Sequence, residues 1–379
     1  MTILHIHDRV GRYGGGEVYL SQLREGIQRL GHRSPVLYLT ETGTERDLGA
    51  DAFCAPKPHG LLSGLRMRRW LGPLLEQLKP DVVHCHCLFS PAGMAWLCAR
   101  VPTLLTLHSL HLLPRTTGSE PMTVFGLYER FLRRLMRPVL RRLTGWIAPS
   151  EAFAGEILGE GFEGVSVVPH FTDKRPSAQA RGPERGRILF VGRLSAEKGI
   201  EALLDTLALL HARSWHAVIV GEGPMEAYAK ARVERESFGE RVTFVGWCAG
   251  TALDREYERA SLVVVPSTVM EAFGFVGIEA LAFGKPVAAF DAGGVREWLE
   301  EGRTGYVVRQ GDCAALAARI DALLEDPDSA RDMGEAGRRL VEARFRLESH
   351  LGHLFLRYEE AVRRRIPGRL PAESYACRH

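Results

Sequence analysis

The stretch LVVVPSTVMEAFGFVGIEALAFGKPV, residues 262–287, decides the fold class. It opens with the uninterrupted apolar run Leu262–Val265, passes through a short segment that holds Pro266, and takes up a helical pattern near Gly274. An apolar run without alternation is typical of a strand that is buried on both faces, as in a parallel sheet covered by helices. The stretch therefore predicts a strand, a loop and a helix of an α/β domain.

Similar apolar runs recur along the chain, at intervals that leave room for a helix between them. In the first half they are Ile3–Ile6, Val36–Leu39, Asp81–His84, Thr103–Leu107 and Gly145–Ala148. In the second half they are Ile188–Val191, Ala217–Val220, Val242–Val245, Val287–Phe290 and Tyr306–Val308. Each half opens with a strand, a glycine-containing turn and an amphipathic helix, predicted over Glu17–Leu30 and over Ile200–His211. Two doubly wound α/β domains fit this pattern, and the cleft between them is the expected site because ligands of such sheets bind at the carboxyl ends of the strands.

The length of 379 residues agrees with two domains of roughly 100–200 residues each. Residues 173–186 (DKRPSAQARGPERG) hold two Pro, two Gly and six charged side chains without apolar periodicity, which predicts a surface linker. We therefore expect a first domain over residues 1–171 and a second over residues 172–349, with a hinge near 171–186. A helical pattern runs over Glu342–Arg365, and residues 367–379 are expected to form a loose tail.

Composition excludes several classes of protein. A hydrophobic content of 45% with 25% charged residues is typical of a soluble globular chain and not of a disordered, collagen-like or polytopic membrane protein. The net charge of +3 does not indicate a nucleic-acid partner. The seven cysteines are odd in number and lack framework spacing, which indicates reduced thiols in a cytoplasm. The first residues form no apolar leader, and no apolar run of about 18 residues follows, so we expect neither export nor a membrane span.

Two carboxylates stand eight residues apart in the deciding stretch, Glu271 and Glu279. On one continuous helix they would point about 80° apart, so a shared ligand requires Glu271 to lie in the loop before the helix. The helix would then begin near Gly274, and its N-terminal N–H groups would offer an anion site. The helix start can bind a phosphate, and the two carboxylates can bind hydroxyls of a sugar and of a ribose. The alternative is a carboxylate favoured by the helix dipole at Glu271 and a surface side chain at Glu279.

The first turn of the second half, VGRLSAEKG at 191–199, carries two cations. Arg193 follows the strand and Lys198 precedes the helix, so both reach one edge of the sheet. There they can neutralise a diphosphate leaving group in place of a metal ion. The alternative is an ordinary pair of solvated loop side chains.

Together these motifs resemble family 4 of the retaining, nucleotide-sugar-dependent glycosyltransferases, which have the GT-B fold. The resemblance rests on VGRLSAEKG, on VGEGP at 220–224, on the stretch at 266–287 and on AGGVREWLEEGRTGYVV at 292–308, and it covers nearly the whole chain. In that family an E-x7-E pair, a G-R-x4-K motif and an N-terminal glycine loop recur together. Here they are Glu271 and Glu279, Arg193 and Lys198, and Gly14–Gly16 followed by Glu17.

The resemblance implies roles for these residues in binding the donor. The diphosphate would be bound by two cations and by the start of a helix, which here are Arg193, Lys198, Gly274, Phe275 and Val276. Glu279 would bind the ribose hydroxyls of the nucleotide, and Glu271 would contact hydroxyls of the transferred sugar.

The resemblance also assigns features of the first half and of the C-terminus. The glycines Gly15 and Gly16 would let the backbone approach the phosphates or the acceptor, which a Cβ would obstruct. His108, at the end of Thr103–Leu107, matches a family histidine near the donor sugar; the alternative is a buried, hydrogen-bonded side chain at a strand end. A C-terminal helix at about 350–366 would cross back to the first domain.

The implied activity is transfer of a hexosyl group from a UDP- or GDP-sugar with retention at the anomeric carbon, by front-side substitution. No cofactor and no metal are expected, and the acceptor is a saccharide, a lipid-linked molecule or a small molecule. Double displacement through Glu271 has no support in the sequence. Two alternatives stay open: a nucleotide-sugar 2-epimerase of the same architecture, and a non-catalytic nucleotide-sugar-binding subunit.

Two groups of residues imitate metal sites. Asp326-Pro327-Asp328 follows a helical pattern, which predicts a turn at a helix end rather than a strand end. The run His84-Cys85-His86-Cys87 lies on a strand, where alternate side chains point to opposite faces, and no second cluster has zinc spacing. We expect no metal at either place.

A basic amphipathic pattern runs over residues 127–143. Its apolar positions recur every fourth residue among the arginines Arg130, Arg133, Arg134, Arg137, Arg141 and Arg142. Such a helix can lie on an anionic membrane, which would suit a lipid-linked acceptor and a peripheral place on the inner face of the membrane. The alternative, which the pattern favours, is a helix packed on the first sheet with a solvated arginine face. Pro138 is expected to kink or end it.

Overall fold

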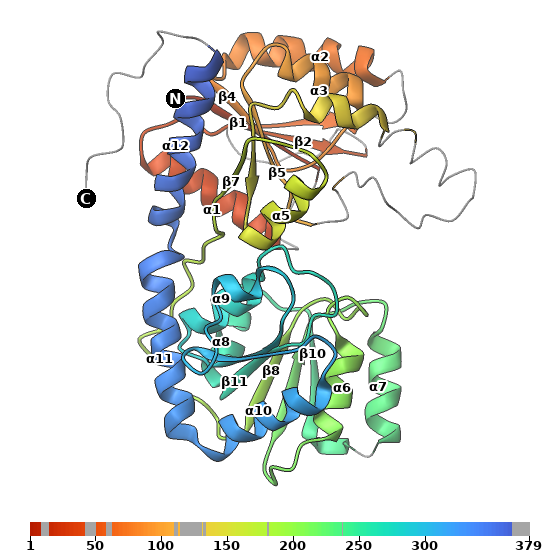
Figure 1. Ribbon diagram of the computed structural model, residues 1–379, viewed down its shortest axis with the longest axis vertical. Helices are drawn as coiled ribbons and strands as arrows, with labels where there is room; N and C mark the ends of the chain where they lie inside the picture. The colour runs from red at the N-terminus through yellow and green to blue at the C-terminus, as the bar shows by residue number, and fades with distance from the viewer. Residues whose placement is uncertain are drawn as a thin grey trace. The chain divides into compact units, whose positions relative to one another are not determined.

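Two parallel sheets organise the chain (Figure 1). The computed structural model describes residues 1–8, 15–41, 51–57, 63–109, 113, 131, 134–179, 182–236 and 238–365. The chain divides into unit 1, which is Met1–Pro169 with the C-terminal segment from Leu347, and unit 2, which is His170–Arg346. The sequence-based boundaries stood at 171/172 and 349/350, and the expected tail at 367–379 lies outside the described residues.

Unit 1 holds a seven-stranded parallel sheet with the order β3-β2-β1-β4-β5-β6-β7. Its strands are β1 (Ile3–His7), β2 (Val36–Thr40), β3 (Ala52–Pro56), β4 (Val82–Cys85), β5 (Thr103–Thr106), β6 (Gly145–Ala148) and β7 (Val165–Val167). Its helices are α1 (Gly15–Arg29), α2 (Ser63–Leu78), α3 (Pro91–Cys98), α5 (Glu151–Gly159) and α12 (Leu347–Arg365). The edge strand β3 was not predicted, because its short sequence AFCAP holds none of the valine, isoleucine or leucine residues that mark the central strands.

Unit 2 holds a six-stranded parallel sheet with the order β10-β9-β8-β11-β12-β13. Its strands are β8 (Arg187–Val191), β9 (His216–Val220), β10 (Val242–Gly246), β11 (Leu262–Val265), β12 (Val287–Phe290) and β13 (Gly305–Val308). Its helices are α6 (Ile200–Ala208), α7 (Glu226–Arg235), α8 (Thr251–Arg259), α9 (Phe275–Ala282), α10 (Cys313–Glu325) and α11 (Pro327–Arg344), with short 3-10 turns at Gly239–Arg241 and Gly294–Glu297. Helix α6 ends at Ala208, three residues before the predicted His211.

The core of unit 2 shows why its strands read as continuous apolar runs. Ile188 and Phe190 of β8 belong to one hydrophobic cluster, while Leu189 between them belongs to another, because successive side chains of a strand point to opposite faces. Both faces of the sheet are therefore covered, as the sequence predicted. The strand order reverses between the neighbours β8 and β11, and such a switch point is where open α/β sheets bind their ligands.

The C-terminal helical pattern is broken at one point, and the predicted single helix over Glu342–Arg365 was wrong there. Helix α11 ends at Arg344 and α12 begins at Leu347. Between them the buried Arg346 donates from Nη1 to the carbonyl oxygens of Thr172 and Lys174, each at 3.0 Å. A helix that continued through this position would turn the guanidinium away from those carbonyls. Beyond the break, α12 packs on α1 and β4 within unit 1.

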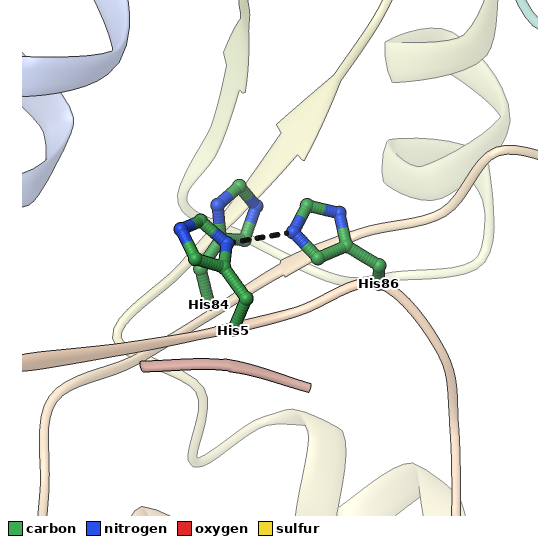
Figure 2. Close-up of side chains that lie close together, drawn as sticks. All are labelled: His5, His84 and His86. Carbon is green, nitrogen blue, oxygen red and sulfur yellow. Dashed lines mark hydrogen bonds between the residues drawn. The ribbon is translucent and has the colours of Figure 1, made fainter. Parts of the chain in front are cut away.

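A layer of histidines lies on one face of the unit 1 sheet (Figure 2). His5 of β1 and His84 of β4 are partners in the parallel register, and His86 follows two residues later on the same face. Nδ1 of His5 lies 3.1 Å from Nε2 of His86. His84 is bonded at both nitrogens, to the hydroxyl of Tyr358 and to that of Thr106, each at 2.8 Å. The alternation expected for the His84–Cys87 run is confirmed, but the third histidine comes from a strand distant in sequence.

Burial lowers the pKa of five imidazoles in this region. The pKa of His5 falls to about 3, that of His108 to about 3 and that of His350 to about 4. Burial also holds the pKa values of His84 and His86 well below the usual 6.5. All five are therefore neutral in the folded protein at neutral pH.

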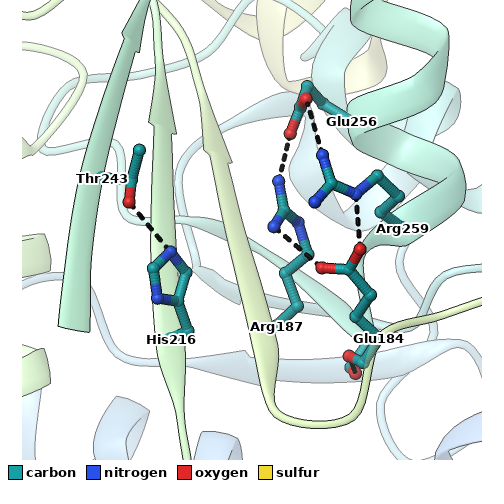
Figure 3. Close-up of polar contacts among 7 residues, drawn as sticks. Glu184, Arg187, His216, Thr243, Glu256 and Arg259 are labelled. Carbon is teal, nitrogen blue, oxygen red and sulfur yellow. Dashed lines mark hydrogen bonds and ion pairs between the residues drawn. The ribbon is translucent and has the colours of Figure 1, made fainter. Parts of the chain in front are cut away.

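The residues of the linker that the structure describes are bound to α8 (Figure 3). Glu184 accepts from Arg187 of β8 at 3.0 Å and from Arg259 of α8 at 2.6 Å. Arg187 also pairs with Glu256. Earlier in the linker, the N–H of Ser177 donates to a carboxylate oxygen of Glu258 at 2.7 Å. The linker thus follows the surface of unit 2 through defined contacts.

The basic stretch is described only in part. Residues 134–140 are helical, so of the two outcomes predicted for Pro138, a kink or an end, the helix does not end there. Met136, Val139 and Leu140 are buried, and Arg137 donates to Glu160 at 2.9 Å. These contacts support the packed-helix alternative, whereas residues 114–130 lie outside the described part. None of the described helices combines the length and the apolar character that crossing a membrane would require.

The buried imidazoles predict that unit 1 loses stability in acid. A histidine whose pKa is lowered on folding binds fewer protons in the folded state, so its contribution is complete above pH 6.5 and declines as the pH falls towards the folded pKa. For His5 alone the loss at pH 5 is about 2 kcal/mol relative to pH 7. Urea unfolding at pH 7, 6 and 5 measures it.

Two substitutions provide the controls for this pH dependence. His5→Leu should flatten the dependence on pH, because one buried imidazole no longer takes up a proton on unfolding. His211→Ala should leave it unchanged, since that side chain is 88% exposed. Equal stability of the wild-type protein at pH 7 and pH 5 would contradict the prediction.

Candidate functional site

The loops that follow β8 and β11 approach each other closely. Gly199, at the start of α6, has a left-handed φ of 74°, and a Cβ at this position would lie 1.8 Å from the carbonyl oxygen of Pro266. The N–H of Thr268 donates to the Glu197 carbonyl at 3.0 Å, and its hydroxyl donates to that of Ala196 at 2.7 Å. The two motif-bearing loops are therefore fixed against one another at the switch point of the sheet.

This approach brings the two predicted motifs into contact. Nζ of Lys198 donates to Oε1 of Glu271 at 2.6 Å, and the Ser267 hydroxyl donates to the same oxygen at 2.5 Å. Glu271 lies in the loop before α9, as a shared ligand requires, and its backbone pairs with Gly293 after β12. The Glu271 side chain is 12% exposed and that of Lys198 is 41% exposed. A cation and a carboxylate therefore meet at the edge of the sheet, with the cation accessible to solvent.

Arg193 lies at the other side of the same turn, directly after β8. It is exposed and makes no ion pair with any residue that the structure describes. Its guanidinium is therefore available to an anion, whereas Lys198 must exchange its carboxylate partner for one.

Helix α9 begins where the sequence predicted. Gly274 precedes it with a left-handed φ of 97°, and no side chain of the described chain caps the helix start. The ring of Phe275 stacks on His170, with 4.6 Å between ring centroids, and Val276 is partly buried. The N-terminal end of α9 therefore carries the positive end of the helix dipole beside Glu271 in the chain.

The indole of Trp298 packs directly against α9. A Cβ on Gly277 would lie 2.0 Å from Cη2 of this fully buried indole, so only glycine fits at this position of the helix. The indole Nε1–H donates to the carbonyl of Phe273 at 2.6 Å, which also holds the loop before the helix.

Glu279 lies inside α9 with partners of its own. The hydroxyl of the buried Tyr257 donates to Oε2 of Glu279 at 2.9 Å. Burial raises the pKa of Glu279, while Lys174 and the Tyr257 hydrogen bond oppose that rise. Glu271 and Glu279 are thus held separately, one by Lys198 and Ser267 and the other by Tyr257.

Unit 1 brings together the two features expected there. Gly15 and Gly16 begin α1, and a Cβ on Gly16 would lie 3.9 Å from Cδ2 of His108. His108 follows β5 by two residues, and its Nε2 lies 3.2 Å from Nδ1 of His86. His108 is therefore a buried, hydrogen-bonded side chain, as the alternative interpretation expected. Its nearness to Gly16 is also compatible with a role at the glycine turn. Gly14 lies outside the described residues.

The histidine layer brings three possible metal ligands together but, among the residues that the structure describes, supplies no negative charge to balance a cation. Ligand atoms of His5, His84 and His86 lie within 4.8 Å of one another. Both nitrogens of His84 already have hydroxyl partners, and none of the groups that shift the three pKa values is a carboxylate. A buried divalent cation would lack a compensating negative charge here. The segment Asp326-Pro327-Asp328, the other group that resembles a metal site in sequence, lies between two helices. Asp326 caps α11 by accepting from the Ser329 N–H at 3.0 Å, so the predicted turn at a helix end is confirmed.

Two families match the chain. The one described as Glycosyltransferase Family 4 matches residues 13–175, and the one described as Glycosyl transferases group 1 matches residues 172–340. The phosphatidyl-myo-inositol mannosyltransferase of Mycobacterium leprae is 30% identical over 336 residues, which cover 83% of this chain and 84% of that protein. The chain belongs to glycosyltransferase family 4.

Further relatives agree with this membership. The glycogen synthase of Mycobacterium tuberculosis is 28% identical over 364 residues, covering 90% of this chain and 86% of that enzyme. Among solved structures, sucrose-phosphate synthase of Thermosynechococcus elongatus aligns with a TM-score of 0.75 at 24% identity, covering 94% of this chain and 98% of that one. Anabaena Alr3699/HepE in complex with UDP and glucose aligns at 0.72 and 21%, with the same coverage. The predicted GT-B fold is confirmed, and this family 4 glycosyltransferase is an enzyme that uses a nucleotide-sugar donor.

Replacing Gly277 tests the support of α9. Gly277→Ala must displace either the helix or the indole of Trp298, and overpacking of this kind lowers stability by about 1–3 kcal/mol. Thermal denaturation should show a lower midpoint for this variant. Gly352→Ala is the matched control, because a Cβ there meets nothing within 4 Å and alanine favours a helix. A Gly277→Ala variant as stable as that control would contradict the packing described above.

Proposed function

We propose that this family 4 glycosyltransferase transfers a hexosyl group from a UDP- or GDP-sugar with retention at the anomeric carbon, without a metal ion or other cofactor. The observation that carries the proposal is the hydrogen bond between Lys198 and Glu271, because it joins the two motifs at the switch point of unit 2. Arg193 and the start of α9 add positive potential at the same edge.

The donor diphosphate would draw Lys198 away from Glu271. Lys198 and Arg193 then neutralise the phosphate oxygens, and the N–H groups at the start of α9 add hydrogen bonds. Glu271, still held by Ser267, is left to accept from hydroxyls of the transferred sugar. Glu279, oriented by Tyr257, accepts from the ribose hydroxyls. His108 and the glycine turn contact the donor sugar in this proposal.

The chemical step follows from this arrangement. The bond between the anomeric carbon and the diphosphate oxygen breaks, and the acceptor oxygen bonds to the same face of that carbon. The departing phosphate oxygen takes the acceptor proton, so no enzymatic base is needed. In this proposal Glu271 keeps its hydrogen bond to Ser267 and binds hydroxyls of the sugar, so we prefer front-side substitution to double displacement through Glu271.

The acceptor is proposed as a saccharide or a lipid-linked molecule. Relatives include enzymes named for both kinds, such as the glycogen synthase and the phosphatidyl-myo-inositol mannosyltransferase. A cytoplasmic enzyme with weak peripheral contact to the inner face of the membrane, through residues around 127–143, would suit the second kind. Family membership favours transfer over a 2-epimerase or a non-catalytic subunit, and product analysis without acceptor separates epimerisation from transfer.

Removing the Lys198 ammonium should abolish most activity. Once a panel of UDP-, GDP- and ADP-sugars has identified the donor by thermal shift, kcat/KM of Lys198→Ala should be at least about 100-fold below that of the wild type, as for loss of a charge that stabilises a leaving group. Lys230→Ala, which removes a half-exposed lysine paired with Glu226 in α7, is the control and should stay at the wild-type value. An unchanged kcat/KM in Lys198→Ala would refute the role in diphosphate binding.

Chelation tests whether cations of the chain replace a metal. Turnover should survive dialysis against EDTA, because Arg193 and Lys198 supply the positive charge that a magnesium ion would otherwise provide. Initial rates with and without EDTA measure this. Complete loss that Mg²⁺ restores would show that a metal carries this role.

A further inference from the structure

Lys174 brings a positive charge from the linker to the surroundings of Glu279. Its ammonium forms an ion pair with Asp254 of α8, and only 17% of its side chain is exposed. The same ammonium lies 6.0 Å from the ring centroid of Tyr257, whose hydroxyl donates to Oε2 of Glu279 at 2.9 Å. These four residues form one cluster, which we call the Glu279 cluster, and none of the sequence motifs includes Lys174.

The backbone of Lys174 is fixed by contacts that do not involve its side chain. Its carbonyl oxygen accepts from Nη1 of the buried Arg346 at 3.0 Å, and its N–H donates to the hydroxyl oxygen of Thr172 at 3.2 Å. The N–H of Thr172 donates in turn to the Phe345 carbonyl at 2.9 Å. The break between α11 and α12 therefore determines where the Lys174 side chain starts within unit 2.

Three groups face the carboxylate of Glu279. The hydroxyl of Tyr257 and the carboxylate of Asp254 come from α8, and the ammonium of Lys174 comes from the linker. Helix α9 carries no charged side chain besides Glu279, and α11 packs on α9 with a glycine, Gly337. Two carboxylates thus share the Glu279 cluster, and Lys174 supplies the positive charge.

This charge opposes the effect of burial on Glu279. Burial raises the pKa of Glu279 and the Asp254 carboxylate raises it too, whereas the Lys174 ammonium and the Tyr257 hydrogen bond lower it. Lys174 has the larger of the two lowering effects. A protonated carboxyl group carries an O–H donor where a carboxylate offers an acceptor, so only the ionised side chain can accept hydrogen bonds freely at both oxygens.

We propose that Lys174 is a positioning residue for the donor: its ammonium balances the Glu279 carboxylate and thereby keeps both carboxylate oxygens as acceptors for the two ribose hydroxyls. This inference rests on the proposed function in one respect, because that function supplies the ribose. The charge balance within the Glu279 cluster does not depend on it. Lys174 acts through Glu279 and needs no contact of its own with the nucleotide.

The protonation of Glu279 can be measured by NMR on the full chain labelled with ¹³C at the carboxyl carbon of the glutamate side chain, with Glu279→Gln assigning the signal. Lys174→Gln can still donate a hydrogen bond to Asp254 but carries no charge. In this variant the Glu279 midpoint should rise by about one pH unit or more, as for loss of a nearby opposite charge. Lys174→Arg keeps the charge and should stay near the wild-type midpoint.

Two further variants separate charge from structure. Arg175→Met is the matched control, because it removes a cation from the next residue of the linker, where the side chain is exposed. It should leave the Glu279 midpoint unchanged. Asp254→Asn removes the repelling carboxylate and should lower the midpoint, opposite to Lys174→Gln, although both variants break the same ion pair. A linker that was merely loosened would move the midpoint in the same direction in both.

Nucleotide binding tests whether this charge affects the ribose. Isothermal titration at pH 6 and pH 8.5 compares UDP and GDP with their 2′,3′-dideoxy forms, which lack both hydroxyls. At pH 6 Lys174→Gln should bind the ribonucleotide about tenfold more weakly than the wild type does, as for loss of hydrogen bonds to a charged acceptor. The difference should narrow at pH 8.5, where Glu279 regains its charge. The dideoxy form should bind both proteins equally.

Three results would overturn the proposal. They are an unchanged Glu279 midpoint in Lys174→Gln, a midpoint that rises in both Lys174→Gln and Asp254→Asn, and an equal loss of affinity for the ribonucleotide and its dideoxy form. The last result would mark a direct contact of Lys174 with the phosphates.

Other outcomes are kept distinct from these. Should Lys174→Gln fail to fold, Asp254→Asn still decides, because an unchanged or raised Glu279 midpoint in that variant contradicts the charge balance. Absence of nucleotide binding by the wild type would instead count against the proposed function and leave the titration of Glu279 standing.

Discussion

The close approach of the loops after β8 and β11 is the constraint on which the site of unit 2 depends. Gly199 allows it, because any side chain there would collide with the carbonyl of Pro266. The approach sets Lys198 within hydrogen-bond distance of Glu271, and Gly277 allows α9 to pack closely against Trp298. Two motifs that are more than seventy residues apart along the chain are thus brought together at one edge of the sheet by backbone contacts.

Much of this arrangement could be predicted from the sequence, because the information is local. Continuous apolar runs marked the central strands, which are buried on both faces, and the geometry of an α-helix alone required Glu271 to precede α9. The family motifs then named Arg193, Lys198 and Glu279. These features depend on periodicity and on spacing within one βα unit, which one sequence displays directly.

The remaining features arise from pairing between distant segments. His5 joins His84 and His86 only through the register of β1 with β4, and Tyr257 reaches Glu279 only because α8 packs beside α9. At the break between α11 and α12, Arg346 donates to carbonyl groups of distant residues, Thr172 and Lys174. The helical pattern of the sequence is continuous there, so the break could not be predicted from it. Ser267 was within reach of sequence reasoning, because it precedes Glu271 by four residues in a loop already expected to be functional.

The contact between Lys198 and Glu271 has a consequence for selectivity. The Glu271 carboxylate already occupies the Lys198 ammonium. A simple anion that binds Lys198 must therefore break this ion pair and leave Glu271 without its cation. Under the proposed roles, a sugar nucleotide would compensate both groups at once, because its phosphates would bind the lysine and its hydroxyls would bind the glutamate. The pair would then discriminate against simple phosphates, which can replace only the carboxylate.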